Sequence, residues 1–327
     1  MKKYDFTKEV EKLIDPITVG TIHFIQYFNS LLPKSVQRKV MESSSKKTPY
    51  MGFVVEPYSY FLCYEIKDIK YAESLIPDNF ELIKTSIFAC DEPKYYGIFG
   101  FINAHTSAFF GLRVEFYIIA LNKLTGLLSW IIIDYDTNTI TYDNKNGLRS
   151  PNSSGSVITT DYNGNVIADV KNANHQFAFI SNIKNGVMTN LDQRLWLEGN
   201  LSIGYGKNLS KLNGDIFSLK FNPSEVKEAL RIDSKDLDIT TNTWYPGLLE
   251  DSPSEIVCFP YAQHYVSDAP GYASNLKDRE ELEDSIGKID FDNIQVFSTT
   301  KIRKMFLIGS LISMLIIVIL IILLIFK

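Results

Sequence analysis

The chain has 327 residues, of which 45% are hydrophobic, 13% aromatic and 22% charged, and its formal net charge is −5 at pH 7. This acidic balance excludes a general electrostatic attraction for nucleic acid, so no nucleic-acid partner is expected. Three widely spaced cysteines, Cys63, Cys90 and Cys258, exclude a disulfide framework and fit a reducing compartment.

The first 48 residues form a segment of their own, which we expect to be helical. Apolar residues recur at helical spacing from Ile14 to Leu32, and a basic stretch follows them. Two interpretations stay open: a helix packed on the main domain, which we favour, or an amphipathic helix lying on a membrane surface. Charges are spread over residues 2–15 without an apolar stretch, so we expect no secretory signal here.

Residues 49–270 show the pattern of a β domain. Aromatic and β-branched residues recur in short runs separated by turn residues, including the Asn163-Gly164 pair, which is typical of a hairpin. Short helices are expected at residues 72–77 and 223–230. Strands are predicted at residues 58–65, 80–90, 96–104, 112–121, 127–135, 156–160, 166–170, 177–183, 195–204 and 216–221.

Short strands joined by hairpin loops, with few helices, define the expected fold class. They predict a mainly β (α+β) fold, an antiparallel β-barrel or cone-like domain with peripheral helices. The charged residues 271–300 predict a solvated helix or stalk between this domain and the end of the chain.

The run from Met305 to Phe326 contains no charged residue. As a helix it would be roughly 33 Å long, enough to cross a hydrocarbon core of about 30 Å. It is apolar on every side, as a membrane-spanning helix is. The sequence therefore predicts a C-terminal transmembrane helix, a single-pass anchor whose partner is the lipid bilayer.

The charges beside this run predict its orientation. Lys301, Arg303 and Lys304 precede it and only Lys327 follows it, and a cationic flank marks the cytoplasmic side of a membrane. We therefore expect a membrane protein held by a C-terminal anchor with the main domain in the cytosol, although the particular membrane stays open.

No metal or cofactor site is predicted. The four histidines lie far apart, and the chain contains no His-x-x-x-His or Cys-x-x-Cys pair, no phosphate loop and no Gly-x-Ser-x-Gly turn. Each histidine is therefore expected to be a surface residue or a satisfied core residue.

The charges that stand out are Arg113 and Glu115, within a strongly apolar predicted strand. Because side chains alternate along a strand, both lie on the same face. If that face lines the interior of the domain, the two charges are buried and either neutralise each other or form part of a site. If the face is exposed to water, they are ordinary surface residues.

Four short stretches between residues 55 and 265 carry a resemblance to a known family. Leu75-Ile76-Pro77 resembles an early leucine-x-proline segment, and residues 111–119 resemble a strand with a Glu after a Gly. Residues 134–148 resemble a loop running from an Asp to a Gly-Phe-Pro or Gly-Leu-Pro element, and residues 192–196 are similar to a Thr-Glu-Arg-Tyr-like stretch. Together they resemble the acetoacetate decarboxylase-like superfamily.

This resemblance implies a cone- or barrel-like antiparallel β fold around an internal pocket, with Glu115 matching the family's strand glutamate. In the family's decarboxylases a Schiff-base lysine follows the Gly-Phe-Pro element. Here Gly147-Leu148-Arg149 is followed by Ser150-Pro151, so that lysine is missing, and Lys145 stands before the glycine. Without an amine no imine can form, so we expect no Schiff-base decarboxylase chemistry.

We therefore expect a membrane-anchored cytosolic β domain that binds a small hydrophobic or carboxylic ligand. Arg113 and Glu115 are the expected polar anchors, with Arg149 and Arg194 as candidate partners for a ligand carboxylate. One alternative is an acid–base enzyme of the same superfamily, a lyase or isomerase with Glu115 as catalytic residue. Another is a non-catalytic adaptor whose interior is filled by side chains.

Overall fold

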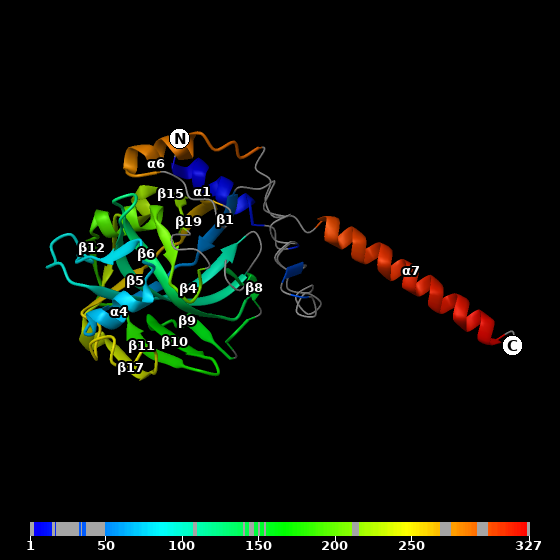
Figure 1. Cartoon of the computed structure of the whole chain (residues 1–327), viewed down its shortest axis with the longest axis horizontal. Helices are drawn as coiled ribbons and strands as arrows, with labels where there is room; N and C mark the ends of the chain where they lie inside the picture. Colours follow the sequence, from blue (N-terminus) through cyan, green and yellow to red (C-terminus); the bar gives the residue numbers. More distant parts are fainter. Residues whose placement is uncertain are drawn as a thin grey trace.

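The computed structural model describes residues 3–14, 17, 33, 35–36, 50–106, 110–139, 141–143, 147–149, 151–153, 155–210, 216–268, 276–292 and 300–325. These residues form a body of β-sheets with short helices at its periphery. A long C-terminal helix projects from the body (Figure 1).

The largest sheet is centred on three long strands rich in Phe, Tyr and Ile: β4 (Tyr96–Thr106), β5 (Phe110–Asn122) and β6 (Leu128–Thr137). The strands beside them are β2 (Ser59–Glu65), β12 (Val187–Asn190), β13 (Ile203–Tyr205), β14 (Ile216–Phe217), β16 (Glu228–Arg231) and β18 (Glu255–Phe259). The order across the sheet is β12-β16-β18-β2-β4-β5-β6-β13-β14. Neighbours are antiparallel, except that β6 and β13 run parallel.

A second row of strands branches from β4. It consists of β1 (Tyr50–Val55), β19 (Gln263–Asp268) and β15 (Leu219–Phe221), while β3 (Phe80–Leu82) pairs with β5. Within the described residues the sheets do not close into a barrel, because the end strands β12 and β14 each pair on one side only. The mainly β class with peripheral helices is confirmed, and the expected barrel is corrected to an open, branched sheet.

A four-stranded sheet covers one face of the large sheet. Its order is β17 (Leu237–Asn242), β11 (Gln176–Asn182), β10 (Asn165–Lys171) and β9 (Val157–Thr160). The hairpin predicted at Asn163-Gly164 joins β9 to β10, with Gly164 at a φ of 76°. A small hairpin is formed by β7 (Thr141–Asp143) and β8 (Gly147–Arg149).

Two apolar cores lie on opposite faces of the large sheet. Alternation along β5 sends Val114, Phe116 and Ile118 toward the four-stranded sheet, where all three are fully buried. The opposite face of β2, β4, β5 and β6, here termed the inner face, carries Phe61 and Tyr117. Arg113 and Glu115 share the strand alternation of Tyr117 and therefore lie on this inner face.

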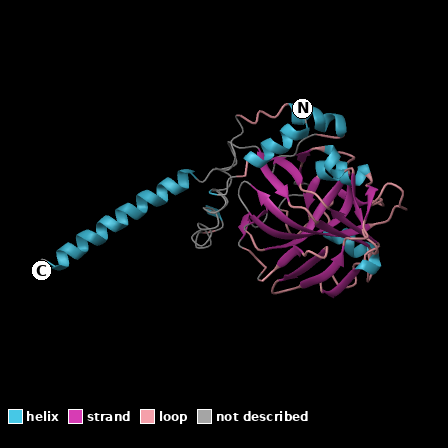
Figure 2. Cartoon of the chain, turned by 180° about the vertical axis from the view of Figure 1, so that it is seen from behind, coloured by secondary structure: helices cyan, strands magenta, loops and turns pink. Residues whose placement is uncertain are grey.

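Two helices cover the outer side of β1, β19 and β15. They are α1 (Lys3–Lys12) and α6 (Arg279–Gly287), seen together at the top of the body in Figure 1 and again from behind in Figure 2. Phe6 and Val10 of α1 are buried, and Phe6 contacts Phe291 with ring centroids 6.1 Å apart. A helix of the N-terminal segment thus packs on the main domain, while the apolar positions from residue 22 to residue 32 lie outside the described residues.

The expected stalk contains α6, which is not fully solvated. Leu282 and Ile286 stand one turn apart on α6 and are buried in the same core as α1. This part of residues 271–300 therefore belongs to the body, because two apolar side chains outweigh a charged sequence around them. The division of the chain at residues 48, 270 and 300 stays a prediction.

Residues 195–204 form helical turns where a strand is predicted. A π-helical turn (Arg194–Glu198) is followed by α5 (Gly199–Leu201), and only the end of the run is strand β13. Asp192 accepts a 2.9 Å hydrogen bond from the Leu195 amide, which starts the turn. Trp130 packs against Gly199, where a Cβ would lie 2.0 Å from the indole nitrogen. An apolar run of this length does not distinguish a buried strand from a buried helix.

The remaining short elements are α4 (Ile69–Leu75) and two 3-10 turns, Pro223–Val226 and Ser234–Asp236. They confirm helical structure near residues 72–77 and 223–226. The predicted strand at residues 80–90 ends at Leu82, and the predicted helix at 223–230 gives way to β16.

The C-terminal helix α7 (Thr300–Ile325) projects away from the body (Figures 1 and 2). Its stretch Leu307–Ile325 has a mean hydropathy of 3.3, and none of that stretch is buried against the rest of the chain. By length and composition this one helix could cross a membrane.

Candidate functional site

The inner face of β5 brings a charged pair and a tyrosine hydroxyl together. Arg113, Glu115 and Tyr117 alternate along the strand, so their side chains point the same way. The Arg113 Nε–H donates to Oε1 of Glu115, and the Tyr117 hydroxyl donates to Oε2. Both carboxylate oxygens of Glu115 are therefore occupied by neighbours on its own strand.

Burial and the neighbouring Glu115 carboxylate shift the pKa values of Arg113 and Tyr117. Burial by itself would lower the pKa of Arg113, but the adjacent Glu115 carboxylate raises that pKa above its usual value. Burial and the same carboxylate raise the pKa of Tyr117 well above its usual value, so its hydroxyl keeps the proton that it donates. The pair is thus neutral as a unit, with its charges held in place.

Arg113 has hydrogen-bonding capacity left over. Its guanidinium carbon lies 4.4 Å from the ring centroid of Tyr135 on β6. Among the described residues only its Nε has a hydrogen-bond partner, and 21% of the side chain is exposed. The Nη groups can therefore bind a carboxylate or carbonyl oxygen that reaches the inner face.

The floor of the inner face is aromatic. Phe61 lies on β2, where it pairs with Gly100 of β4. Its ring makes edge contacts with Trp130, Trp196 and Phe259 at centroid distances of 6.2, 5.3 and 5.8 Å. Gly100 pairs with Glu115 across the sheet, and a Cβ there would lie 2.9 Å from the Phe61 ring. The glycine lets this ring lie beside the charged pair.

Solvent reaches the inner face, whereas the central part of the opposite face of the same strands is fully buried. The buried face includes Tyr60, Leu62, Phe99, Phe101, Val114 and Phe116, all fully buried. The partly exposed side chains of the inner core include Phe61, Ile102, Arg113, Tyr117, Tyr205 and Phe217. A surface that is apolar, aromatic and partly accessible around one charged pair has the composition of a ligand site.

Of the other two predicted site residues, the structure describes the side chain of Arg194 alone, and it pairs elsewhere. Arg194 is half exposed, with 51% of its side chain accessible, and its guanidinium pairs with Glu198 at 3.7 Å along its own helical turn. Arg149 ends β8, and its side chain lies outside the described part of the chain, as does Lys145. The roles assigned to these residues from the sequence stay predictions.

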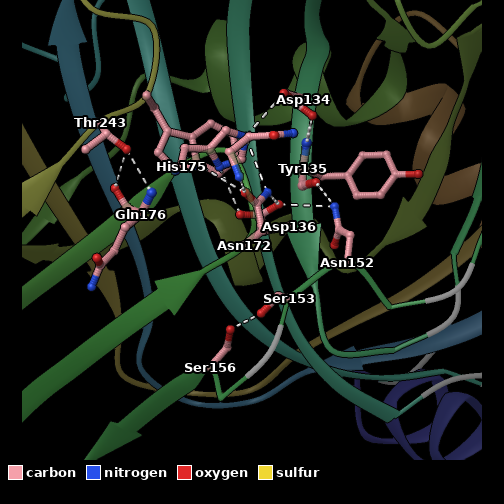
Figure 3. Close-up of polar contacts among 12 residues, drawn as sticks. Asp134, Tyr135, Asp136, Asn152, Ser153, Ser156, Asn172, His175, Gln176 and Thr243 are labelled. Carbon is pink, nitrogen blue, oxygen red and sulfur yellow. Dashed lines mark hydrogen bonds and ion pairs between the residues drawn. The ribbon is translucent and has the colours of Figure 1, made fainter.

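A second polar cluster lies behind β6, on the face opposite Tyr135 (Figure 3). His175, in the turn between β10 and β11, lies between two aspartates of β6. Its Nδ1 is 3.1 Å from Asp136, whose side chain is fully buried, and its Nε2 is 3.7 Å from Asp134. Asp136 Oδ1 also accepts from the side-chain amides of Asn152 at 3.1 Å and Asn172 at 2.5 Å.

Sequence reasoning missed both Tyr117 and the His175 cluster. Tyr117 continues the alternation of Arg113 and Glu115, a detectable pattern that an aromatic residue in an apolar strand conceals. Asp134 and Asp136 show the same two-residue spacing, but nothing local connects them to His175 about forty residues later. Among the described residues no group of three or more His, Cys, Asp or Glu side chains could hold a metal ion.

Comparisons with known proteins give structural neighbours only. No protein-family model and no curated protein matches the chain. It is similar to the acetoacetate decarboxylase of Legionella pneumophila subsp. pneumophila str. Philadelphia 1, at 14% identity and a TM-score of 0.40, over 68% of this chain and 86% of that one. It is also similar to a second acetoacetate decarboxylase structure, at 10% identity and a TM-score of 0.39, over 72% and 92%. At these values the neighbours assign no role to any residue here.

Proposed function

We propose that the body binds a small ligand on its inner face, an aromatic or aliphatic molecule with a carboxylate or carbonyl group, and that α7 holds the body at a membrane. The observation that carries the proposal is Arg113. It is fixed through Nε by Glu115, backed by the Tyr135 ring, and still has unused donors where solvent reaches it. A preorganised guanidinium costs little further ordering when it binds a planar oxygen group.

The aromatic floor supports the apolar part of this ligand class. Phe61, Tyr117 and Tyr205 are partly exposed on the same side as Arg113, and burying such rings under a ligand is favourable at about 25 cal/mol per Å². Because Arg113 and Glu115 cancel in charge, most of the binding free energy would come from this apolar contact. The guanidinium would set the orientation of the ligand.

Binding is better supported than acid–base catalysis by Glu115. A general base takes the substrate proton on a carboxylate oxygen, and donors already bound to that oxygen compete with the substrate. Here Oε1 accepts from Arg113 and Oε2 from Tyr117, so both oxygens are engaged. A group arranged in this way orients its neighbours and is poorly placed to accept a proton.

The membrane tether complements such a site. Residues 288–299 between α6 and α7 could span at most about 40 Å when extended, so the body would stay within that distance of the bilayer. A ligand that is partly apolar concentrates at membranes, where a tethered binding domain would meet it. We propose the cytosolic side on the cationic flank of α7.

The proposal is tested with the full chain in detergent micelles and a panel of small aromatic and aliphatic carboxylates. At least one should raise the unfolding temperature of the wild type. Arg113→Gln should lose that response, whereas Arg279→Gln, which removes an exposed arginine of α6, should respond like the wild type. A panel without any response, or an Arg113→Gln protein that responds fully, would contradict the proposal and favour the adaptor alternative.

If Arg113→Gln does not fold, Tyr117→Phe provides the second variant. It removes one hydroxyl and leaves the ring, so Glu115 is less firmly held and the response should weaken without disappearing. An unchanged response in Tyr117→Phe would argue against a site built on Glu115.

A further inference from the structure

We propose that His175 is a positioning residue for the inner-face site: while it is protonated, it clamps the β6 segment that holds Tyr135 against Arg113. The part that concerns ligand binding rests on the proposed function. The contacts of His175 with Asp134 and Asp136, here termed the clamp, are present in the protein without a ligand.

Residues 134–136 of β6 direct side chains to both sides of the sheet. Tyr135 is on the inner face, where its ring stacks under the Arg113 guanidinium, and Asp134 and Asp136 point to the other side (Figure 3). Whatever holds these aspartates therefore fixes the backbone that carries the Tyr135 ring. The Tyr135 ring is the part of β6 that contacts the Arg113 guanidinium.

This segment begins at an irregularity of the sheet. Along the β5–β6 ladder Phe116 pairs with Asp134 but Tyr117 pairs with Ile132, so the register shifts and Ile133 is left without a partner. A bulge of this kind bends the strand and re-aims the side chains that follow it. Segment 134–136 thus depends more than a regular strand on contacts other than the ladder.

His175 supplies such contacts from another sheet. It lies between Asp136 at 3.1 Å and Asp134 at 3.7 Å, and its ring packs against Trp244 in a tilted arrangement with centroids 3.8 Å apart. Its turn is fixed by Asn172, whose side-chain oxygen accepts from the His175 amide at 2.8 Å. The imidazole therefore joins the β10–β11 turn, β6 and the chain after β17.

The charges around this imidazole favour its cationic form. Among the described residues, the titratable groups that face it are Asp134 and Asp136 of β6 and the hydroxyl of Tyr245, which is 3.4 Å from Asp134. Burial would lower the pKa of His175, but the two aspartates raise it to about 9. At neutral pH the clamp is therefore closed, and it opens as the pH rises through about 9.

The test measures the position of Arg113 directly. The full chain in micelles is labelled with arginine carrying ¹³C at Cζ, an atom that does not exchange with water, and Arg113→Lys identifies the Arg113 signal. The Tyr135 ring current shifts this signal, so it should move with a midpoint near pH 9 in the wild type. In His175→Gln it should already stand at its high-pH position at neutral pH.

The matched control is His105→Gln. His105 also pairs with a carboxylate, that of Glu56, but it lies on β4 and contacts neither Asp134 nor Asp136 within the described part of the chain. The Arg113 signal of this variant should follow the wild type at every pH. A wild-type signal that does not titrate, or a His175→Gln signal that equals the wild type at neutral pH, would overturn the clamp. If His175→Gln does not fold, the wild-type titration decides alone.

Phenylacetate, a small aromatic carboxylate, provides the ligand arm. Opening the clamp should weaken its binding about tenfold, whether by raised pH or by His175→Gln. If phenylacetate binds equally well to His175→Gln and the wild type, the positioning role is wrong and the proposed function stands. If no carboxylate binds any of these proteins while the Arg113 signal still titrates, the proposed function is wrong and the clamp stands.

Discussion

At the scale of single residues, Glu115 holds two other polar side chains of the inner face in place. Its two oxygens hold the guanidinium of Arg113 and the hydroxyl of Tyr117, and each partner is held in the form that donates. Removing one member of a mostly buried ion pair leaves the other charge without compensation. The stability of the body should therefore depend on this pair more than on any exposed pair.

The first prediction concerns Glu115→Gln. The change leaves Arg113 charged and unpaired, so the free energy of unfolding should fall by about 3 kcal/mol. Denaturant unfolding of the full chain in micelles measures it. The control is Asp284→Asn, which breaks the exposed pair with Lys288 and should cause no measurable loss. Equal losses in the two variants would show that the Arg113–Glu115 pair is not buried as described.

The second prediction is a pH dependence of stability from His175. Its folded-state pKa is about 9, above the value of about 6.5 for an unfolded histidine. The stabilisation is thus fully present below about pH 6.5 and is lost as the pH rises through about 9, by at most about 3 kcal/mol. Unfolding measured across this range should show the decline, and His175→Gln should remove most of it. A wild-type protein equally stable at both ends would contradict the assignment.

At the scale of elements, the helices at the two ends of the described body matter most. The helices α1 and α6 cover β1, β19 and β15, and α1 is also fixed by Glu11, which lies 3.2 Å from the buried His264. The start of the chain and the segment leading to α7 therefore meet on one surface. The segment that precedes α7 is thus packed on the body at least as far as Phe291, which contacts Phe6.

The third prediction tests whether α6 is packed or solvated. Leu282 is fully buried, so Leu282→Ala should lower the free energy of unfolding by about 2–5 kcal/mol. Leu124→Ala is the control, because 79% of Leu124 is exposed in a hairpin loop. Should Leu282→Ala be as harmless as Leu124→Ala, α6 would be the solvated stalk that its charges suggest.

The elements differ in how far the sequence predicts them. The alternation of residues 112–121 was enough to place Arg113 and Glu115 on one face of a strand. The strand predicted at residues 195–204 is wrong, because the helical turns found there are buried by contacts such as that of Trp130 with Gly199. No local pattern encodes such a contact. In α6 the buried Leu282 and Ile286 stand among six charged or polar residues, which hide them in the sequence. The His175 cluster joins β6 to a distant turn, which no local pattern shows.

At the scale of the whole molecule, the two faces of the large sheet differ in what covers them. One face is sealed by the four-stranded sheet and holds the body together, while the inner face stays partly accessible around Arg113. The long apolar α7 projects from this body (Figure 1). Together they suggest a binding domain kept close to a bilayer.

The fourth prediction concerns this tether. Removing residues 300–327 deletes α7 and with it the apolar surface that would enter a bilayer, so the shortened chain should appear in the soluble fraction after cell lysis. The full chain should stay in the membrane pellet and resist extraction at high pH. A shortened chain that still resists extraction would contradict an anchor formed by α7.

The most direct test of the central claim, ligand binding at Arg113, is native mass spectrometry of the full chain released from micelles. The account predicts that the wild type and Arg279→Gln carry a bound small molecule with an acidic or carbonyl group, and that Arg113→Gln has the bare mass of its sequence. A wild-type chain that is bare, or an Arg113→Gln chain that carries the same molecule in the same proportion, would contradict it.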